Sequence, residues 1–169
     1  RVLFRSNGSS ITVVDKTTGR DGADTLVNIT RLGFVDEDIA FDFDGIAGQA
    51  YRIYQAAFDR KPDAGGLGFW IAQMDKGATL HSVAENFLAS PEFQSLYGQS
   101  PPNTDFVSAL YKNVLHRQGD QSGIDFWNGL LNNGFSRADT LANFCDSPEN
   151  KAGVIGSIQG GIHYIEFNG

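Results

Sequence analysis

The chain carries the same sequence unit twice. Residues 54–92 align on residues 111–149 without a gap, so each matching residue recurs 57 positions later. A fixed period of this length is typical of a supersecondary unit that buries its apolar face against its copy. The duplication therefore constrains the architecture more than any other feature does. The recurring residues of the first copy are Tyr54, Arg60, Asp63, Gly66, Phe69, Trp70, Gly77, Asn86, Phe87, Ser90, Pro91 and Glu92.

The apolar spacing within each copy predicts three or four helices. In the first copy, Ile46, Ala50 and Ile53 fall on one helical face, and the second copy repeats this period. We expect the copies to span about residues 46–97 and 103–160. Because each helix would expose an apolar stripe by itself, we also expect the two copies to pack against each other.

Residues at the expected helix ends carry capping signals. Asp63 can accept amide hydrogen bonds at the start of the second helix, and Gly77 suits the left-handed backbone beyond its end. Ser90, followed by Pro91 and Glu92, is typical of the start of a further helix. Since each of these residues recurs in the second copy, the same helix boundaries are predicted there.

The pattern before residue 45 is β-like instead. Residues 10–15, 26–35 and 39–44 form short apolar or β-branched runs between Gly and Asp clusters, which predicts three strands. Residues 1–8 fit no clear element. Residues 162–167 alternate like a final strand, which we expect to rejoin the N-terminal sheet.

These patterns predict a mainly α protein. It would contain two homologous multi-helix repeats packed as one helical domain (residues 45–169), preceded by a small N-terminal β segment (residues 1–44). A chain of 169 residues with 41% hydrophobic content has ample material for a core. The net charge of -7, without clusters of Lys and Arg, argues against nucleic acid as a partner. No run approaches the roughly 18 apolar residues of a membrane span, so we expect no membrane insertion.

Polar and aromatic residues that recur in both copies are the candidate ligand-binding residues. They are Arg60, Asp63 and Trp70, with their counterparts Arg117, Asp120 and Trp127. Arg and carboxylate groups recognise sugars or anions, and exposed Trp rings can stack on sugars. In the competing interpretation, Asp caps a helix, Arg braces the loop and Trp anchors the core. The structural interpretation is favoured, because a structural loop at a helix junction would be repeated in this way.

We expect the protein to have no catalytic activity, because the sequence shows no catalytic constellation. His81, His116 and His163 do not recur between the copies, and no short-spaced pair supports a metal site. The chain has no nucleophile elbow, phosphate-binding loop or zinc signature. The acidic residues at 36–38 and 42–44 fit solvated turns better than a hydrolase dyad.

Calcium is the one cofactor that the sequence suggests. Residues 19–26 fit the β-roll nonapeptide Gly-Gly-x-Gly-x-Asp-x-apolar-x, with Arg20 in the second glycine position. Asp21 and Asp24 could contribute carboxylate ligands to a site completed elsewhere. A plain Asp-Gly turn between strands is the competing interpretation.

Two segments resemble known families. The helical part, over roughly residues 45–165, resembles a bacterial helical domain of unknown function, the family numbered 4214. That family recurs in RTX-type secreted proteins and surface-layer proteins and is distantly similar to phycobilisome linker domains. The N-terminal residues 21–34 resemble the end of an RTX β-roll. The helical resemblance is carried by Tyr54-Gln-Ala-Ala-Phe-Asp-Arg60, Pro62-Asp-Ala-Gly-Gly-Leu67, Phe69-Trp70 and Phe87-Leu-Ala-Ser-Pro-Glu-Phe93.

The resemblance implies an exported bacterial protein, extracellular or at the cell surface, without established catalytic residues. We therefore expect a non-catalytic module for adhesion, surface attachment or assembly, with a protein or a surface polysaccharide as its partner. Two alternatives stay open: a carbohydrate-binding module, and a non-catalytic fragment of a larger extracellular enzyme. Exposure of Trp70 and Trp127 beside Arg60 and Arg117 would favour sugar binding, whereas buried rings would favour scaffolding.

Overall fold

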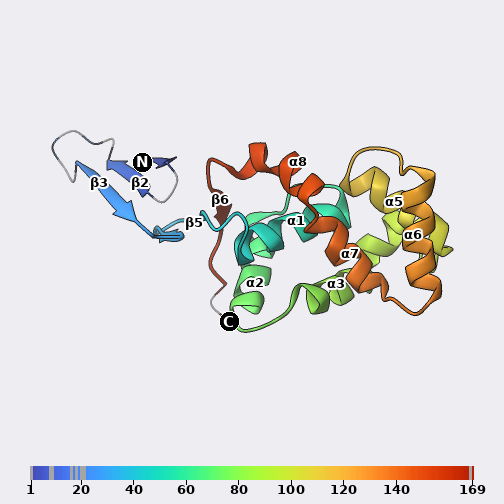
Figure 1. The fold of residues 1–169 in the computed structure, drawn as a ribbon. Helices are drawn as coiled ribbons and strands as arrows, with labels where there is room; N and C mark the ends of the chain where they lie inside the picture. The colour runs from blue at the N-terminus through green and yellow to red at the C-terminus, as the bar shows by residue number, and fades with distance from the viewer. Residues whose placement is uncertain (1, 8–9, 16, 18, 20–21, 168) are drawn as a thin grey trace.

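Helices make up most of the chain in the computed structural model of the protein, as predicted (Figure 1). The structure describes residues 2–7, 10–15, 17, 19, 22–167 and 169. The first copy contains α1 (Ile46–Phe58), α2 (Ala64–Asp75), α3 (Leu80–Leu88) and α4 (Pro91–Tyr97). The second copy contains α5 (Asn103–Val114), α6 (Gln121–Asn132), α7 (Arg137–Cys145) and α8 (Pro148–Ile158). Each helix of the second copy begins 57 residues after its counterpart, so the duplication extends to the secondary structure.

Capping side chains explain why the helix boundaries repeat. The carboxylate of Asp63 accepts a hydrogen bond from the Gly66 amide, and Asp120 accepts one from Gly123. The hydroxyl of Ser90 caps α4 in the same way, and its counterpart in the second copy caps α8. Gly77, just beyond α2, has a φ of 104°, a backbone conformation that glycine adopts without a steric penalty. The predicted capping signals are therefore confirmed.

Helix α1 lies at the centre of a single core that both copies share. Its residues Ala50, Ile53 and Ala57 are fully buried, and the helix packs on α2 and α3 of its own copy and on α5 and α7 of the other. The copies also meet where α3 packs on α7. One cluster of buried apolar residues runs through both copies, so neither copy has a core of its own.

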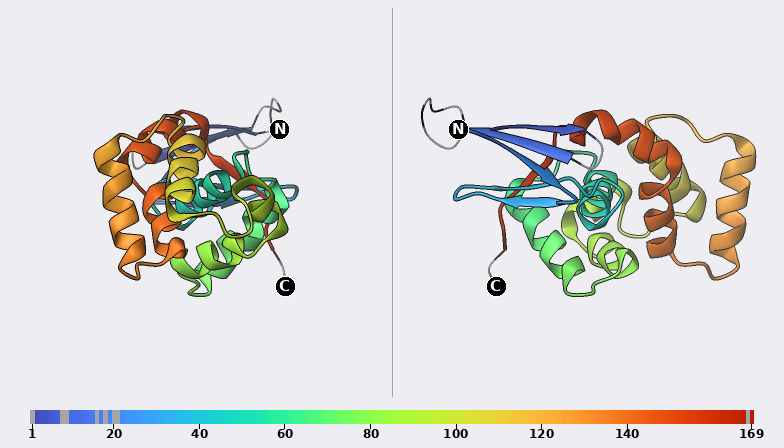
Figure 2. Two further views of the ribbon diagram at one scale, coloured as in Figure 1. Left: turned by 90° about the vertical axis from the view of Figure 1, so that its right-hand side faces the viewer. Right: turned by 60° about the vertical axis from the view of Figure 1, so that its left-hand side comes forward.

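Among the described residues, six strands form two small antiparallel sheets. The first sheet contains β1 (Val2–Asn7), β2 (Ser10–Asp15) and β3 (Ala23–Val27), and it lies to one side of the helices (Figures 1 and 2). The second contains β4 (Arg31–Gly33), β5 (Asp38–Ala40) and β6 (Ile162–Tyr164). Strand β6 thus rejoins an N-terminal strand, as expected, although it pairs with β5 rather than with the first sheet.

Three details of the β segment differ from the sequence prediction. Residues 2–7, for which no element was predicted, form β1 because they pair along their whole length with β2. The single strand predicted over 26–35 is divided between β3 and β4, because Asn28 turns the chain with a φ of 60°. The strand predicted over 39–44 ends at Ala40, since the backbone of Asp42 already accepts hydrogen bonds from the turn that starts α1.

The C-terminal segment that follows β6 covers the first copy. The amide of Ile165 donates a hydrogen bond to the carbonyl of Ala64 at the start of α2 (3.0 Å). A Cβ at Gly68 would lie 1.8 Å from the carbonyl oxygen of Ile165, so only glycine permits this approach. The rings of Phe69 and Phe167 meet edge to face, with centroids 5.0 Å apart. The second copy has no such cover among the described residues.

Candidate functional site

The repeated Arg residues form bidentate ion pairs with the repeated Glu residues. Arg60 donates from Nε to Oε1 of Glu92 (2.7 Å) and from Nη2 to Oε2 (3.2 Å). Arg117 and Glu149 repeat this geometry at 2.5 and 2.9 Å. In each copy the guanidinium also donates to the backbone carbonyl of the next residue. The pair therefore ties the loop after the first helix to the start of the fourth.

The repeated Asp residues lie beside these Arg residues and act as helix caps. Oδ1 of Asp63 accepts a hydrogen bond from the Gly66 amide at 2.7 Å, and Asp120 accepts one from Gly123 at the same distance. The Gly66 amide is the main reason that the pKa of Asp63 lies below its usual value. The pKa of Asp120 is lowered first by the hydroxyl of Ser122 and then by the Gly123 amide.

Tyr54 completes the polar network of the first copy. Its hydroxyl donates to Oδ2 of Asp63 (2.7 Å) and accepts from Nη2 of Arg60 (3.0 Å). The guanidinium carbons of Arg60 and Arg117 also lie about 5 Å from the ring centroids of Tyr54 and Tyr111. The candidate list drawn from the sequence omitted both Tyr residues. Their recurrence at the repeat spacing is the signal that identifies them.

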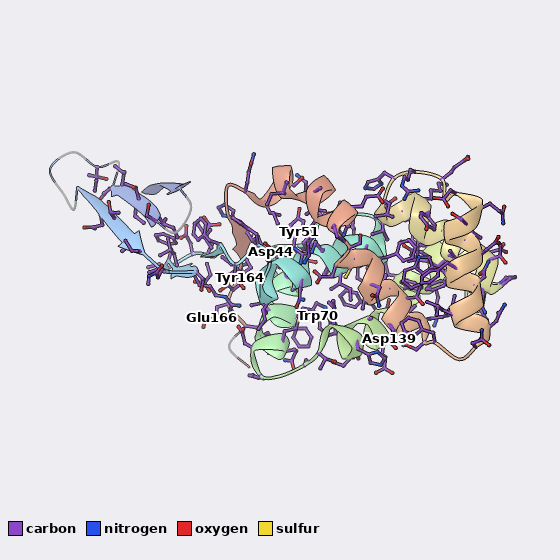
Figure 3. All side chains as sticks on the ribbon, in the orientation of Figure 1. Asp44, Tyr51, Trp70, Asp139, Tyr164 and Glu166 are labelled. Carbon is purple, nitrogen blue, oxygen red and sulfur yellow. The ribbon has the colours of Figure 1, made fainter. Side chains whose placement is uncertain are left out.

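Trp70 and Trp127 are partly buried at the edge of the core. The ring centroid of Trp70 lies 4.8 Å from that of Phe87 and 5.0 Å from that of Phe69, and Figure 3 shows Trp70 on α2 near α3. Trp127 packs against Phe144 at 5.1 Å. Burial is the main reason that the pKa of Tyr111 lies above its usual value.

In each copy, the repeated Arg is engaged by Glu and the repeated Asp caps a helix, and in the first copy Tyr54 links the two. The Arg cations are paired with Glu, which raises the pKa of both guanidinium groups. The same pairing holds the pKa of Glu149 below its usual value. Chemically, the arrangement brings permanently charged groups of opposite sign together. The pKa shifts of Arg60, Arg117 and Glu149 favour the charged form of each group. General acids and bases, by contrast, often have pKa values shifted toward neutral pH.

A buried ion pair joins the two copies and was not predicted. Arg52 on α1 has only 1% of its side chain exposed, and its Nη2 donates to Oδ1 of Asp146 in the second copy (2.5 Å). Its Nη1 donates to the carbonyl of Phe43 (2.6 Å). The repeat gives no signal for this pair, because Ala109 and Ala89 occupy the equivalent positions.

The proposed calcium ligands cannot be placed as a pair. Asp21 lies outside the described residues, and Asp24 is exposed on β3, where it faces Val13 of β2 in the strand register. Within the described part of the chain, no group of three or more His, Cys, Asp or Glu residues could hold a metal ion. Calcium therefore stays a prediction from the sequence.

Comparisons with known proteins give one match. A family model described as "Domain of unknown function (DUF4214)" matches residues 84–154, from the middle of α3 to the middle of α8. Over that range, the match supports the family resemblance seen in the sequence. No curated protein and no solved structure matches the chain significantly. Among the described residues, no helix has the length and apolar character needed to cross a membrane.

Proposed function

We propose that this chain is a non-catalytic structural module of a secreted, RTX-like bacterial protein and that it serves adhesion or surface attachment. Such a module would act outside the cell or at its surface, with a protein or a surface polysaccharide as its partner. The observation that carries the proposal is the identical Arg-Glu brace in the two copies, with fork distances of 2.5 to 3.2 Å. In both copies these charged residues bind each other and fix a loop, which is the use expected of them in a structural module.

A sedimentation experiment tests attachment. The whole chain would be mixed with purified peptidoglycan sacculi or with outer-membrane vesicles that contain lipopolysaccharide, and the pellet would be assayed for protein. We expect saturable sedimentation with at least one of the two materials. An acidic protein of similar size and net charge is the control for trapping. Sedimentation no greater than that of the control with both materials would count against the proposal.

A hydrolysis screen tests the absence of catalysis. The chain would be incubated with chromogenic esters and glycosides, with casein and with a panel of polysaccharides. We expect no release above buffer. Turnover that increases in proportion to the protein concentration, and that survives a further purification step, would contradict the non-catalytic assignment.

Carbohydrate binding is the second candidate, supported by a shallow groove of about 500 Å³ beside Trp127. Leu80 of α3 and Asn143 of α7 also line this groove, so an aromatic face and an amide lie together there. Stacking on an aromatic ring combined with polar contacts is a common way to bind a sugar. Quenching of tryptophan fluorescence by a neutral oligosaccharide would support this candidate, and its loss in Trp127→Phe would locate the site.

Calcium binding by Asp21 and Asp24 is a separate proposal, supported by the β-roll-like pattern of residues 19–26. A ligand that binds only the folded chain raises its stability by mass action. Thermal unfolding with calcium and with a chelator therefore tests the proposal. A higher melting temperature with calcium, abolished in Asp21→Asn/Asp24→Asn, is the expected result, and identical curves would refute it.

A further inference from the structure

A groove of about 790 Å³ lies between α5, α6 and the end of α1. Helices α5 and α6 lie at the end of the molecule away from the first sheet (Figures 1 and 2). Its volume falls in the range of small-molecule sites, which is roughly 300 to 1,000 Å³. Lys112 and His116 line the groove from the C-terminal end of α5 and the residues that follow. Asp59, which follows α1, contributes from the first copy.

Two nitrogen-bearing side chains of this groove are available to a ligand. Lys112 and His116 are exposed, and within the described residues neither side chain makes a hydrogen bond or an ion pair. Arg117 also lines the groove, but its guanidinium is engaged by Glu149 and by the carbonyl of Gln118. An ammonium group and an imidazole that line the same groove therefore offer donors to an anion such as a carboxylate.

Three further side chains of the lining are polar and suit a hydroxyl-rich ligand. Ser108, Asn113 and Gln118 provide a hydroxyl and two amides, each able to donate and to accept hydrogen bonds. The carboxylate of Asp59 can accept hydrogen bonds from ligand hydroxyls. Ile124 is the one branched apolar side chain among the lining residues. A sugar would find several polar partners in this groove.

The first copy shows why the groove is open in the second. The residues that correspond to Ser108 and Asn113 are Tyr51 and Ala56, which are buried with 8% and 1% of their surface exposed. Gln55 stands in place of Lys112 and faces residues of α5 and α8. Tertiary packing, which includes the hydrogen bond from Tyr97 of α4 to the carbonyl of Ala56, thus fills this face of α1. The same face of α5 carries polar side chains and stays open to solvent.

We propose that this groove binds a carboxylate-bearing oligosaccharide, such as a short oligo-uronate. Lys112 and His116 bind the carboxylate, and the Ser, Asn and Gln side chains bind sugar hydroxyls. Since the chain has a net charge of -7, most of its surface repels a polyanion. Binding is therefore expected at the groove, where Lys112 and His116 offer donors. The inference rests on the proposed attachment function and names the chemistry of the polysaccharide.

Titration with trigalacturonate tests the proposal. Binding to the whole chain would be measured by calorimetry at low ionic strength, beside maltotriose as a neutral trisaccharide and inorganic phosphate as a simple anion. We expect binding of trigalacturonate and at least tenfold weaker binding of the other two. The double variant Lys112→Gln/His116→Asn should bind trigalacturonate at least tenfold more weakly than the parent. Asn suits position 116 because that residue has a φ of 51°, a conformation that Asn tolerates.

Lys76→Gln is the matched control, since it removes the same charge from an exposed residue that does not line the groove. The control should bind like the parent, and unfolding curves of all variants should show that they are folded. Three outcomes would overturn the proposal: no binding of trigalacturonate, equal binding of phosphate or maltotriose, or unchanged binding in the folded double variant. Each would leave the sedimentation test intact, because surface attachment could then depend on another face.

Discussion

The two copies of the repeat differ most where other parts of the chain cross them. In the first copy, Gly48 and Gly68 lie under the backbone of Phe43 and of Ile165, where a Cβ would come within 1.7 and 1.8 Å of a carbonyl oxygen. In the second copy the equivalent residues are Asp105 and Asp125, which are both exposed. No chain segment crosses these Asp residues within the described structure. Glycine is therefore present where another segment of the chain crosses the helix, and a charged residue is present where the helix faces solvent.

The loop chemistry, by contrast, is the same in both copies. The Arg-Glu fork and the Asp cap are local to each copy, so they do not depend on what covers the helices. Two kinds of residue therefore occur in each copy. Some stabilise the loops within the copy, and others fit the copy to the segments that pack against it. The open groove on α5 belongs to the second kind.

The largest effect is expected at the ion pair between the copies. Asp146→Ala would leave Arg52 buried without a carboxylate, and removing one partner of a buried pair costs several kcal/mol. Because Asp146 is 27% exposed, we expect about 3 kcal/mol, at the lower end of that range. Urea denaturation measures the change.

Lys151→Ala is the control for this variant. It removes a second cation beside Asp146, since the Lys151 side chain is 33% exposed and lies 3.3 Å from Asp146, and it also removes a 3.8 Å contact between Lys151 and the exposed Asp44. A loss of less than about 1 kcal/mol is expected for such a pair. Equal losses in the two variants would show that the buried pair does not join the copies in the way described.

A substitution at Gly68 tests the difference between the covered and the open helix. Gly68→Ala should displace the C-terminal segment from α2 and cost about 2 kcal/mol, because overpacking of this kind typically costs 1 to 3. Asp125→Ala, at the equivalent position of α6, should be neutral or slightly stabilising, since Ala is the better helix former. Chemical denaturation of both variants gives the comparison. A neutral Gly68→Ala would mean that the segment does not need the close approach.

Sequence reasoning predicted the local features of both copies well. The helices follow from caps and apolar spacing, which lie within a few residues of one another, and so the boundaries around Asp63 and Ser90 were predictable. The roles of Gly48 and Gly68 were not, because a glycine does not show which distant segment will cross it. Strand β1 was missed for the same reason, since its pairing with β2 is what defines it.

The candidate site was predictable only in part. The recurrence of Arg60, Asp63 and their counterparts indicated a repeated network, and the structural interpretation of Asp63 and Asp120 as caps is confirmed. The groove could not be predicted, because Lys112 is unremarkable in the sequence. Its significance comes from the tertiary packing that fills one face of α1 and leaves the same face of α5 open.

A smaller effect is expected at the caps, where the copies should behave alike. Asp63→Ala removes the acceptor of the Gly66 amide and should cost about 1 kcal/mol, within the 0.5 to 2 typical of helix caps. Both Asp63→Ala and Asp120→Ala should therefore lower the melting temperature. A melting curve unchanged by either substitution would contradict the structural role of these loops.

The smallest effect is expected at a contact that exists on one side only. His81 of α3 contacts Asp139 of α7, with Nδ1 and Oδ1 2.6 Å apart, whereas the residues at the reciprocal positions are Ala138 and Ser82. The pKa of His81 is raised mainly by Asp139, so its folded value lies above the unfolded value of about 6.5. The stabilisation is therefore fully present below about pH 6.5 and is lost as the pH rises through the folded pKa.

The matched measurement is the melting temperature of the parent and of His81→Gln between pH 5.5 and 8.5. The parent should exceed the variant at pH 5.5, and the difference should disappear at the alkaline end. His116→Asn is the control, because His116 has no ion-pair partner within the described residues. A difference for His81→Gln that does not change with pH would show that the contact with Asp139 stabilises α3 against α7 by packing alone. The asymmetry between the copies would then have no electrostatic part at this interface.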